Sequence, residues 1–273
     1  MSAYRRLDEC QSFSELIAGS PEPAARAEAF RAAFDGDRVR SRELPAGGGL
    51  SWNWAAMDVL DRELPLLAKL AAEQECVAKY RELASGAVMN TGEKRMVLHH
   101  LARGVVAGRP VHGGKDLRDF YEGERARLSD FAARVRSGAL KGATGKKFAT
   151  VVQIGIGGSD LGPRALHIAL SAWAKAAGRL ALEARFVSNV DPDDANSVLD
   201  GLDLESTLFV LVSKSGTTQE TLANESLAKA KLEKAGLPPS KHLVAVTSET
   251  SPLARNPGYL ESFYIDDFIG GRY

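Results

Sequence analysis

A run rich in hydroxyl groups, with one lysine and one glycine, contains the residue types that most clearly could do chemistry. It consists of Ser213, Lys214, Ser215, Gly216, Thr217 and Thr218. Continuous apolar residues at 207–212 precede it and predict a buried strand, and residues 222–235, of helix-forming composition, follow it. Backbone N–H groups at a helix start lack intrahelical partners, and the helix dipole there favours negative charge. The run therefore predicts a phosphate-binding loop, and its hydroxyls favour a phosphosugar over a nucleotide.

An alternative interpretation of this run is an ordinary polar turn with a helix cap, because serine and threonine commonly occur in both. A Walker-type loop does not fit, since no glycine stands at the required distance before a Gly-Lys-Ser/Thr triplet. Residues 142–147 resemble such a loop only superficially, because Leu140 occupies the first glycine position and Lys147 replaces the hydroxyl.

A second candidate loop, residues 155–163, follows an earlier apolar stretch. The backbone of Gly158 could approach a ligand closely, and Ser159 could contribute a hydroxyl. A dinucleotide loop would need glycine where Asp160 stands, so this carboxylate disfavours a nicotinamide or flavin cofactor. An alternative interpretation of this loop is a tight turn from strand to helix that needs glycine only for its geometry.

Alternating strands and helices from about residue 148 onward must position both loops. The expected strands are 150–154, 184–187, 207–212 and 242–246, and the expected helices are 163–177, 193–199 and 222–235. This order predicts an α/β fold with right-handed crossovers and a parallel sheet covered on both faces. Ligands of such sheets bind outside the carboxyl ends of the strands, where both loops fall.

The amino-terminal half is predicted to be mostly helical. The expected helices are 13–18, 24–34, 56–85, 94–102 and 117–137, with a flexible connection at 45–49 and a loop at 108–114.

The charge balance limits the classes of partner. Lys+Arg and Asp+Glu number 35 each, so nucleic acid and acidic membranes are not expected, and a local cation such as Lys214 must recognise an anion. The two cysteines, Cys10 and Cys76, exclude a disulfide framework and a thiolate zinc site. The thiols are expected to be reduced, the amino terminus lacks the apolar core of a signal peptide, and no apolar stretch is long enough to span a membrane. These features predict a cytoplasmic protein.

A series of motifs occupies residues 90–95, 97–99, 114–116, 134–138, 141–146, 154–163, 187–189, 213–221 and 270–273. Together and in this order, the motifs resemble the phosphoglucose isomerase family, specifically its bacterial branch. The chain departs from the family at 50–57, where Trp-Asn-Trp replaces a tyrosine-containing stretch, and local repacking is expected there.

The resemblance implies a fold and a set of site residues. It implies a helical region at 1–114, followed at 115–273 by the first of two sugar isomerase (SIS) domains, an αβα sandwich truncated at its carboxyl end. Ser213–Thr218 would hold the sugar phosphate, Gly158 and Ser159 would line the same pocket, and Arg272 would stabilise charge on the intermediate. The implied reaction needs neither a metal nor an organic cofactor.

That reaction interconverts glucose 6-phosphate and fructose 6-phosphate, a step of glycolysis and gluconeogenesis, by proton transfer through a cis-enediol(ate). The segments matching the family's catalytic glutamate, ring-opening histidine and later lysine lie beyond Tyr273. The resemblance therefore predicts an amino-terminal fragment that supplies the phosphate-binding half and does not isomerise. It also implies a homodimer for the full-length protein.

Three other functions stay open. A phosphosugar-sensing SIS module would use the same loops without catalysis, but Arg272 and residues 90–95 favour the isomerase. Other SIS enzymes share the phosphate loop but not the whole motif series. A dinucleotide-dependent oxidoreductase is opposed by Asp160.

Overall fold

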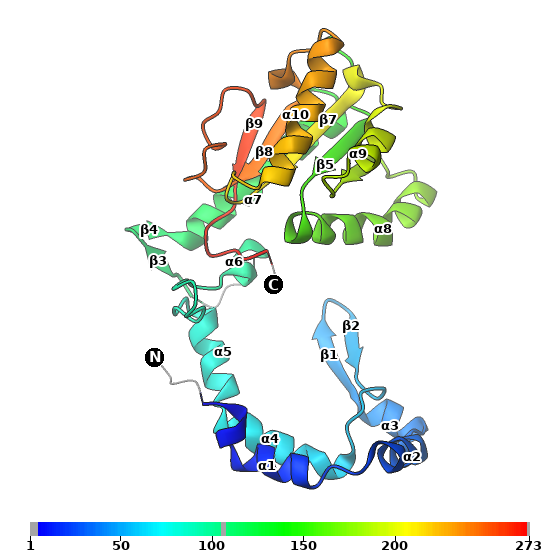
Figure 1. Ribbon diagram of the computed structural model, residues 1–273, viewed down its shortest axis with the longest axis vertical. Coiled ribbons are helices and arrows are strands. Elements are labelled where there is room, and N and C mark those ends of the chain that lie inside the picture. Colours follow the sequence, from blue (N-terminus) through cyan, green and yellow to red (C-terminus); the bar gives the residue numbers. More distant parts are fainter. Residues whose placement is uncertain (1–4, 105–107, 272–273) are drawn as a thin grey trace. The chain divides into compact units, whose positions relative to one another are not determined.

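The computed structural model describes residues 5–104 and 108–271, which form two compact units, Met1–Glu82 and Leu83–Tyr273 (Figure 1). The division expected from the resemblance, between residues 114 and 115, stays a prediction.

The smaller unit consists of short helices and a hairpin, and it contains a buried arginine. Arg38 is 6% exposed and donates hydrogen bonds to the backbone carbonyls of Ala55, Met57 and Val59. The elements are α1 (Gln11–Ala18), α2 (Pro23–Ala33), α3 (Gly36–Ser41), β1 (Glu43–Gly47), β2 (Leu50–Asn53), α4 (Leu64–Glu73) and α5 (Cys76–Ala84), which runs on into the larger unit.

Two predictions for this part of the chain are wrong. Residues 45–49, predicted as a flexible connection, belong to the antiparallel β1–β2 hairpin, whose turn uses the positive φ angles of its glycines. Residues 56–85, predicted as one helix, contain a 3-10 turn at Asp61–Glu63 and the two helices α4 and α5, which are separated because the chain turns at Glu75 with φ of 52°.

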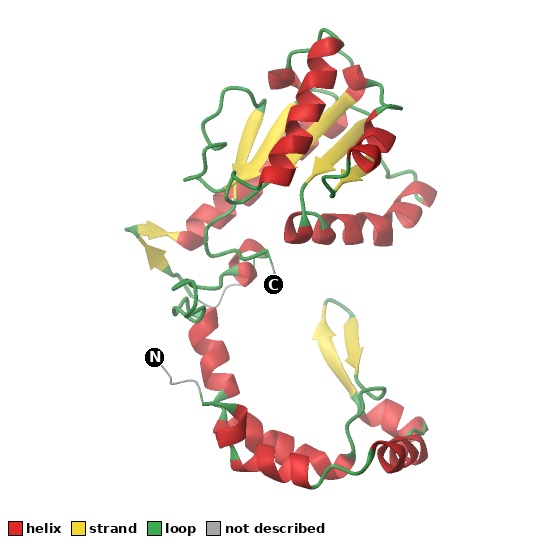
Figure 2. Cartoon of the chain, viewed as in Figure 1, coloured by secondary structure: helices red, strands yellow, loops and turns green. Residues whose placement is uncertain are grey.

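The larger unit is built on a five-stranded, fully parallel sheet in the order β6-β5-β7-β8-β9 (Figure 2). Its elements are α6 (His99–Ala102), β3 (Val111–His112), β4 (Lys115–Asp116), α7 (Leu117–Ser137), β5 (Thr150–Ile154), α8 (Leu161–Ala176), β6 (Glu183–Val187), α9 (Pro192–Leu199), β7 (Thr207–Val212), α10 (Gln219–Lys234), β8 (Leu243–Thr247) and β9 (Glu261–Tyr264). The predicted α/β class is confirmed.

Helices cover both faces of this sheet, because its central strands are apolar on both sides. On one face, Ile154, Phe209 and Leu211 are buried against residues of α9 and α10. On the other face, Leu208 and Val244 pack against α7. Figure 1 shows α10 in front of the sheet and α7 behind it.

The four expected strands are present, with ends within one residue of the prediction. The fifth strand, β9, was not predicted, because its four residues follow an irregular connection and no helix. Residues 94–102, predicted as a helix, contain only α6, since Lys94 has φ of 54° and Asn90 forms a bridge to Arg95.

Asp116 caps the start of α7 and offers a test of the fold. Its Oδ1 accepts the N–H of Arg118 at 2.9 Å and that of Asp119 at 3.4 Å. We expect Asp116→Ala to lower the free energy of unfolding by about 1 kcal/mol in urea titrations. Asp116→Asn keeps the cap and loses only the ion pair with Arg109, so its loss should be smaller; equal losses would contradict the capping role.

Candidate phosphate-binding site

The two predicted loops leave neighbouring strands at the same edge of the sheet. Strands β5 and β7 are parallel and hydrogen-bonded, with Ile154 opposite Leu211 in the register. The loop that contains Ser159 follows β5 directly, and residues 213–218 follow β7 directly. Both loops therefore start at the carboxyl ends of adjacent central strands, where ligands bind in sheets of this kind.

Hydrogen bonds within residues 213–218 fix the shape of this loop. Ser213 is 2% exposed, and its Oγ lies 3.1 Å from Thr218 Oγ1 and accepts the N–H of Gly216 at 3.2 Å. Thr217 donates its N–H and its hydroxyl to Ser215 Oγ, at 3.2 Å and 3.1 Å. Gly216 has φ of 66°, which glycine adopts without strain. The loop ends at Thr218, immediately before the amino terminus of α10.

Residues at the end of β8 support the same loop from the neighbouring strand. Thr247 Oγ1 donates to the carbonyl of Ser213 at 2.7 Å and lies 2.6 Å from Ser251 Oγ. The N–H of Ser248 donates to the carbonyl of Lys214 at 3.0 Å. The loop is therefore held in place before any ligand arrives.

Lys214 lies beside a second cation. Its Nζ donates to the carbonyl of Asp267 at 3.3 Å, and Arg95 Nη1 donates to the same oxygen at 3.2 Å. Burial, and then the positive charge of Arg95, lower the pKa of Lys214. A bound dianion would offset this repulsion, because it places negative charge next to both groups.

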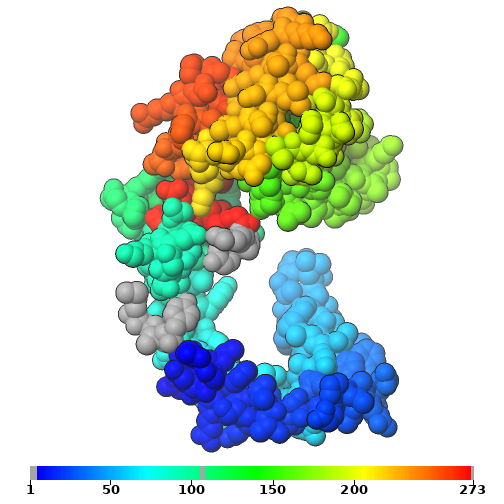
Figure 3. Space-filling view, viewed as in Figure 1, coloured from blue at the N-terminus to red at the C-terminus, as the bar shows by residue number. Residues whose placement is uncertain are grey.

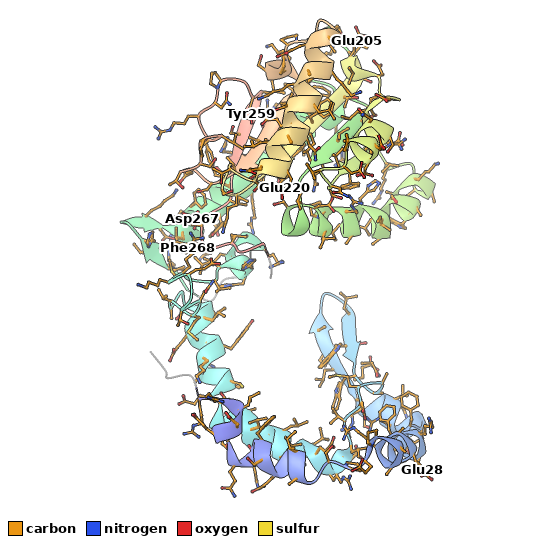
Figure 4. The ribbon with its side chains drawn as sticks, in the orientation of Figure 1. Glu28, Glu205, Glu220, Tyr259, Asp267 and Phe268 are labelled. Atoms are coloured by element: carbon orange, nitrogen blue, oxygen red, sulfur yellow. The ribbon has the colours of Figure 1, made fainter. Side chains whose placement is uncertain are left out.

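The segment after β9, residues 266–271, crosses this region and is called here the carboxyl-terminal strap. Its Phe268 carbonyl accepts the N–H of Leu98 at 3.3 Å, and its Gly270 carbonyl lies 2.8 Å from His99 Nε2. Figure 4 labels two residues of the strap, Asp267 and Phe268. The strap joins residues 95–99 to the phosphate-loop candidate, so the site combines segments far apart in sequence.

Gly158 is the point where the loop after β5 contacts the strap. A Cβ atom at Gly158 would lie 1.9 Å from the carbonyl oxygen of Gly271, so only glycine fits. Gln153 Nε2 donates to the carbonyl of Ser159 at 2.7 Å and fixes this loop. Arg272, the predicted catalytic residue, lies outside the described residues.

The carboxylate of Asp160 is buried and paired with an arginine. It is 3% exposed and forms an ion pair of 3.0 Å with Arg164, which also donates to Ser188 Oγ at 2.7 Å. The Arg164 guanidinium therefore links the Asp160 carboxylate at the start of α8 to Ser188, which follows β6.

A cavity of about 190 Å³ lies beside the strap. Its lining includes His112, Lys115, Glu249 and Asp266. Burial raises the pKa of Asp266, whose Oδ1 accepts the N–H of Phe268 at 2.9 Å. Among residues 5–104 and 108–271, no three His, Cys, Asp or Glu side chains form a group that could hold a metal ion.

The sequence prediction of the site missed Arg95 and Asp267. Arg95 belongs to the motif at 90–95, but motif order gives no distance to Lys214. Asp267 contributes through its backbone carbonyl, which no side-chain pattern reveals.

The fold and the loops at its strand ends define a domain of the sugar isomerase type, an αβα sandwich with a parallel sheet. A profile described as phosphoglucose isomerase matches residues 53–273. The chain belongs to the phosphoglucose isomerase family.

Individual relatives agree with this result. Glucose-6-phosphate isomerase from Treponema denticola is 52% identical over 273 residues, which cover 99% of this chain and 51% of the relative. The enzyme of the same description from Treponema pallidum is 51% identical, with 99% and 51% covered. The crystal structure of a glucose-6-phosphate isomerase from Chlamydia trachomatis superposes with a TM-score of 0.79 at 35% identity, covering 98% of this chain and 50% of that one. The chain thus spans about half the length of these relatives.

Within the described part of the chain, none of the helices combines the length and apolar character that crossing a membrane requires.

Proposed function

We propose that this chain forms the phosphate-binding half of a glucose-6-phosphate isomerase site. The observation that carries the proposal is the loop of residues 213–218 at the carboxyl end of β7, with Lys214 half-buried beside Arg95. The hydroxyls of Ser215, Thr217 and Thr218 and the N–H groups at the start of α10 supply donors for phosphate oxygens. Lys214 supplies the charge.

The phosphate would hold the sugar so that its C1 and C2 carbons lie within reach of the catalytic groups. The isomerisation removes the proton on C2 of the open-chain aldose and returns a proton to C1, through an enediol(ate). Arg272 would stabilise the negative charge that develops on this intermediate. Gly271, which precedes it in the sequence, packs against Gly158 of the loop after β5.

We further propose that the 273-residue chain binds the phosphosugar without isomerising it, since it spans only about half of its relatives. A site completed in a homodimer of full-length protein, in the cytoplasm, is part of the same proposal.

Calorimetric titration of the purified chain with fructose 6-phosphate tests the proposal. We expect a dissociation constant of about 0.1–10 mM, equivalent to roughly 3–5 kcal/mol of binding free energy. Inorganic phosphate should compete, and unphosphorylated fructose should not bind. Absence of any phosphate-dependent binding would contradict the site. In a coupled assay we expect no production of glucose 6-phosphate; measurable turnover would contradict the inactivity and exclude the sensing-module alternative.

A further inference from the structure

The cavity of about 190 Å³ beside the carboxyl-terminal strap is separate from the phosphate-loop candidate, because none of residues 213–218 lines it. Its walls come from the β3–β4 hairpin, the start of α7, the turn after β8 and the strap, all within the larger unit. In Figure 3 the red surface of the strap lies beside the green surface of the hairpin. A water molecule needs about 10–15 Å³ of such space, so the cavity has room for a small organic molecule.

Apolar side chains form one part of the cavity wall. They are Leu117, Phe120, Ile265 and Phe268. The ring of His112 meets the ring of Phe268 edge-on, with the centroids 4.9 Å apart. The hydroxyls of Ser248 and Thr250 also line the cavity, and their oxygens lie 3.0 Å from each other. Apolar walls with a few polar groups are typical of sites for small organic ligands.

The ionisable residues of the lining have a negative balance. Glu249, Asp266 and Asp267 are acidic, and Lys115 and His112 are basic. Three carboxylates therefore outnumber the positive groups even when the histidine is protonated. This balance favours a cation and disfavours a phosphate or carboxylate ligand.

Asp266 is the carboxylate of the lining that lacks a counterion. Its Oδ1 accepts the N–H of Phe268 at 2.9 Å, and among residues 5–104 and 108–271 no lysine or arginine forms an ion pair with it. Burial, and then the negative charge of Asp267, raise the pKa of Asp266, and the charges of Lys115 and His112 offset this effect only in part. A partly buried carboxylate without a cation is unfavourable, so a cationic ligand would gain free energy by pairing with it.

The Lys115 side chain shows how this wall binds an ammonium group. Its Nζ donates to Glu249 Oε2 at 2.8 Å and lies 3.8 Å from the centroid of the Phe120 ring. A carboxylate and an aromatic ring are the two groups that most favour an ammonium in a protein. Asp266 and Phe268 offer the same two groups a second time in the same lining.

We propose that this cavity binds a small organic cation, a primary ammonium group on a short apolar chain, with Asp266 as its counterion. The ammonium would donate to the Asp266 carboxylate, and the hydroxyl oxygens of Ser248 and Thr250 would accept its other hydrogens. The chain would contact Leu117 and Ile265. No residue of the phosphate loop takes part, so this proposal and the proposed function can each fail alone.

Calorimetric titration of the 273-residue chain with n-butylamine tests the proposal, near neutral pH and at about 0.1 M salt, where non-specific attraction is screened. We expect a dissociation constant of about 0.1–10 mM. n-Butanol has the same chain without the charge and should bind about tenfold or more weakly. In NMR spectra of the complex, the amide resonances that shift should belong to residues 112–120, 248–250 and 265–268.

Asp266→Asn removes the charge and keeps an oxygen that can accept the N–H of Phe268. This variant should bind n-butylamine about tenfold or more weakly, since hydrogen bonds to charged groups are the strong ones. Glu233→Gln is the matched control for the loss of one negative charge. Glu233 is exposed in the last turn of α10, at the end away from residues 213–218, and its replacement should leave the affinity unchanged.

Four results would overturn the proposal. Equal affinity for n-butylamine and n-butanol would show that the charge is not recognised. Equal losses in Asp266→Asn and Glu233→Gln would attribute the effect to net charge. Resonance shifts outside the cavity lining would place the amine elsewhere. Tighter binding of an Nα-acetyl-lysine amide than of n-butylamine would assign the cavity to a lysine of a protein partner. Three of these measurements use the unmodified chain, so they decide the question even when Asp266→Asn does not fold.

Discussion

Replacing Gly158 with alanine should weaken binding of fructose 6-phosphate by about tenfold, which corresponds to the loss of about one hydrogen bond of roughly 1.4 kcal/mol when the loop and the strap are pushed apart. The new Cβ would lie 1.9 Å from the carbonyl oxygen of Gly271, so the strap must move away from the loop after β5. Because the contact is with backbone, no rotamer change can relieve it. Overpacking should also lower the free energy of unfolding, by about 1–3 kcal/mol. Calorimetry and urea titration measure the two effects separately.

Gly162→Ala is the matched control for this substitution. Gly162 lies in the first turn of α8, and a Cβ there meets no atom within 4 Å. Alanine in a helix is more favourable than glycine by roughly 0.5–1 kcal/mol, so this variant should be neutral or slightly stabilised. Unchanged affinity in Gly158→Ala would show that the strap does not contribute to the binding of the phosphosugar.

Replacing Lys214 with glutamine should also weaken binding of fructose 6-phosphate by roughly 10–100-fold, the size of a charge-assisted hydrogen bond of about 1.5–3 kcal/mol. The affinity of the unmodified chain should fall as pH rises, because deprotonation of Lys214 removes its charge. Burial and Arg95 lower the pKa of Lys214, so this fall should begin at a lower pH than for an ordinary lysine. Lys214→Gln should lose this alkaline step. Removing the nearby charge in Arg95→Gln should move the step to higher pH.

Lys234→Gln controls for the loss of one positive charge. Lys234 is exposed at the other end of α10, away from the phosphate-loop candidate. Its replacement should leave both the affinity and the pH profile unchanged at moderate salt. A similar loss of affinity in Lys214→Gln and Lys234→Gln would attribute the effect to net charge and would contradict a specific contact.

Local patterns predicted the sheet well. Residues 208–212 are continuously apolar because β7 is covered on both faces, and this pattern locates the strand to within one residue. The break between α4 and α5 gave no such signal, since Glu75 takes a positive φ that its residue type rarely adopts. The glycines at 47–49 predicted flexibility, but a hairpin turn needs the same residues.

In the candidate site, too, the part set by local sequence could be predicted and the part set by tertiary contacts could not. The loop of residues 213–218 could be predicted because a strand, a turn and a helix follow one another in the chain. Arg95 and Asp267 could not, because they meet through tertiary packing, and Asp267 acts through its carbonyl. Distances between such residues depend on the whole arrangement of the larger unit.

The hydrogen bond between Arg95 and Asp267 joins residues 172 positions apart. Closing a loop of that length costs conformational entropy, which is offset only by the packing of the completed unit. Contacts of this kind therefore form late in folding. During synthesis the strand-turn-helix segment at 207–234 can take its shape long before residue 267 leaves the ribosome, but the cationic pair cannot. Affinity for a phosphate ester should therefore develop only when the last segment of this unit has docked, and it can serve as a probe of complete folding.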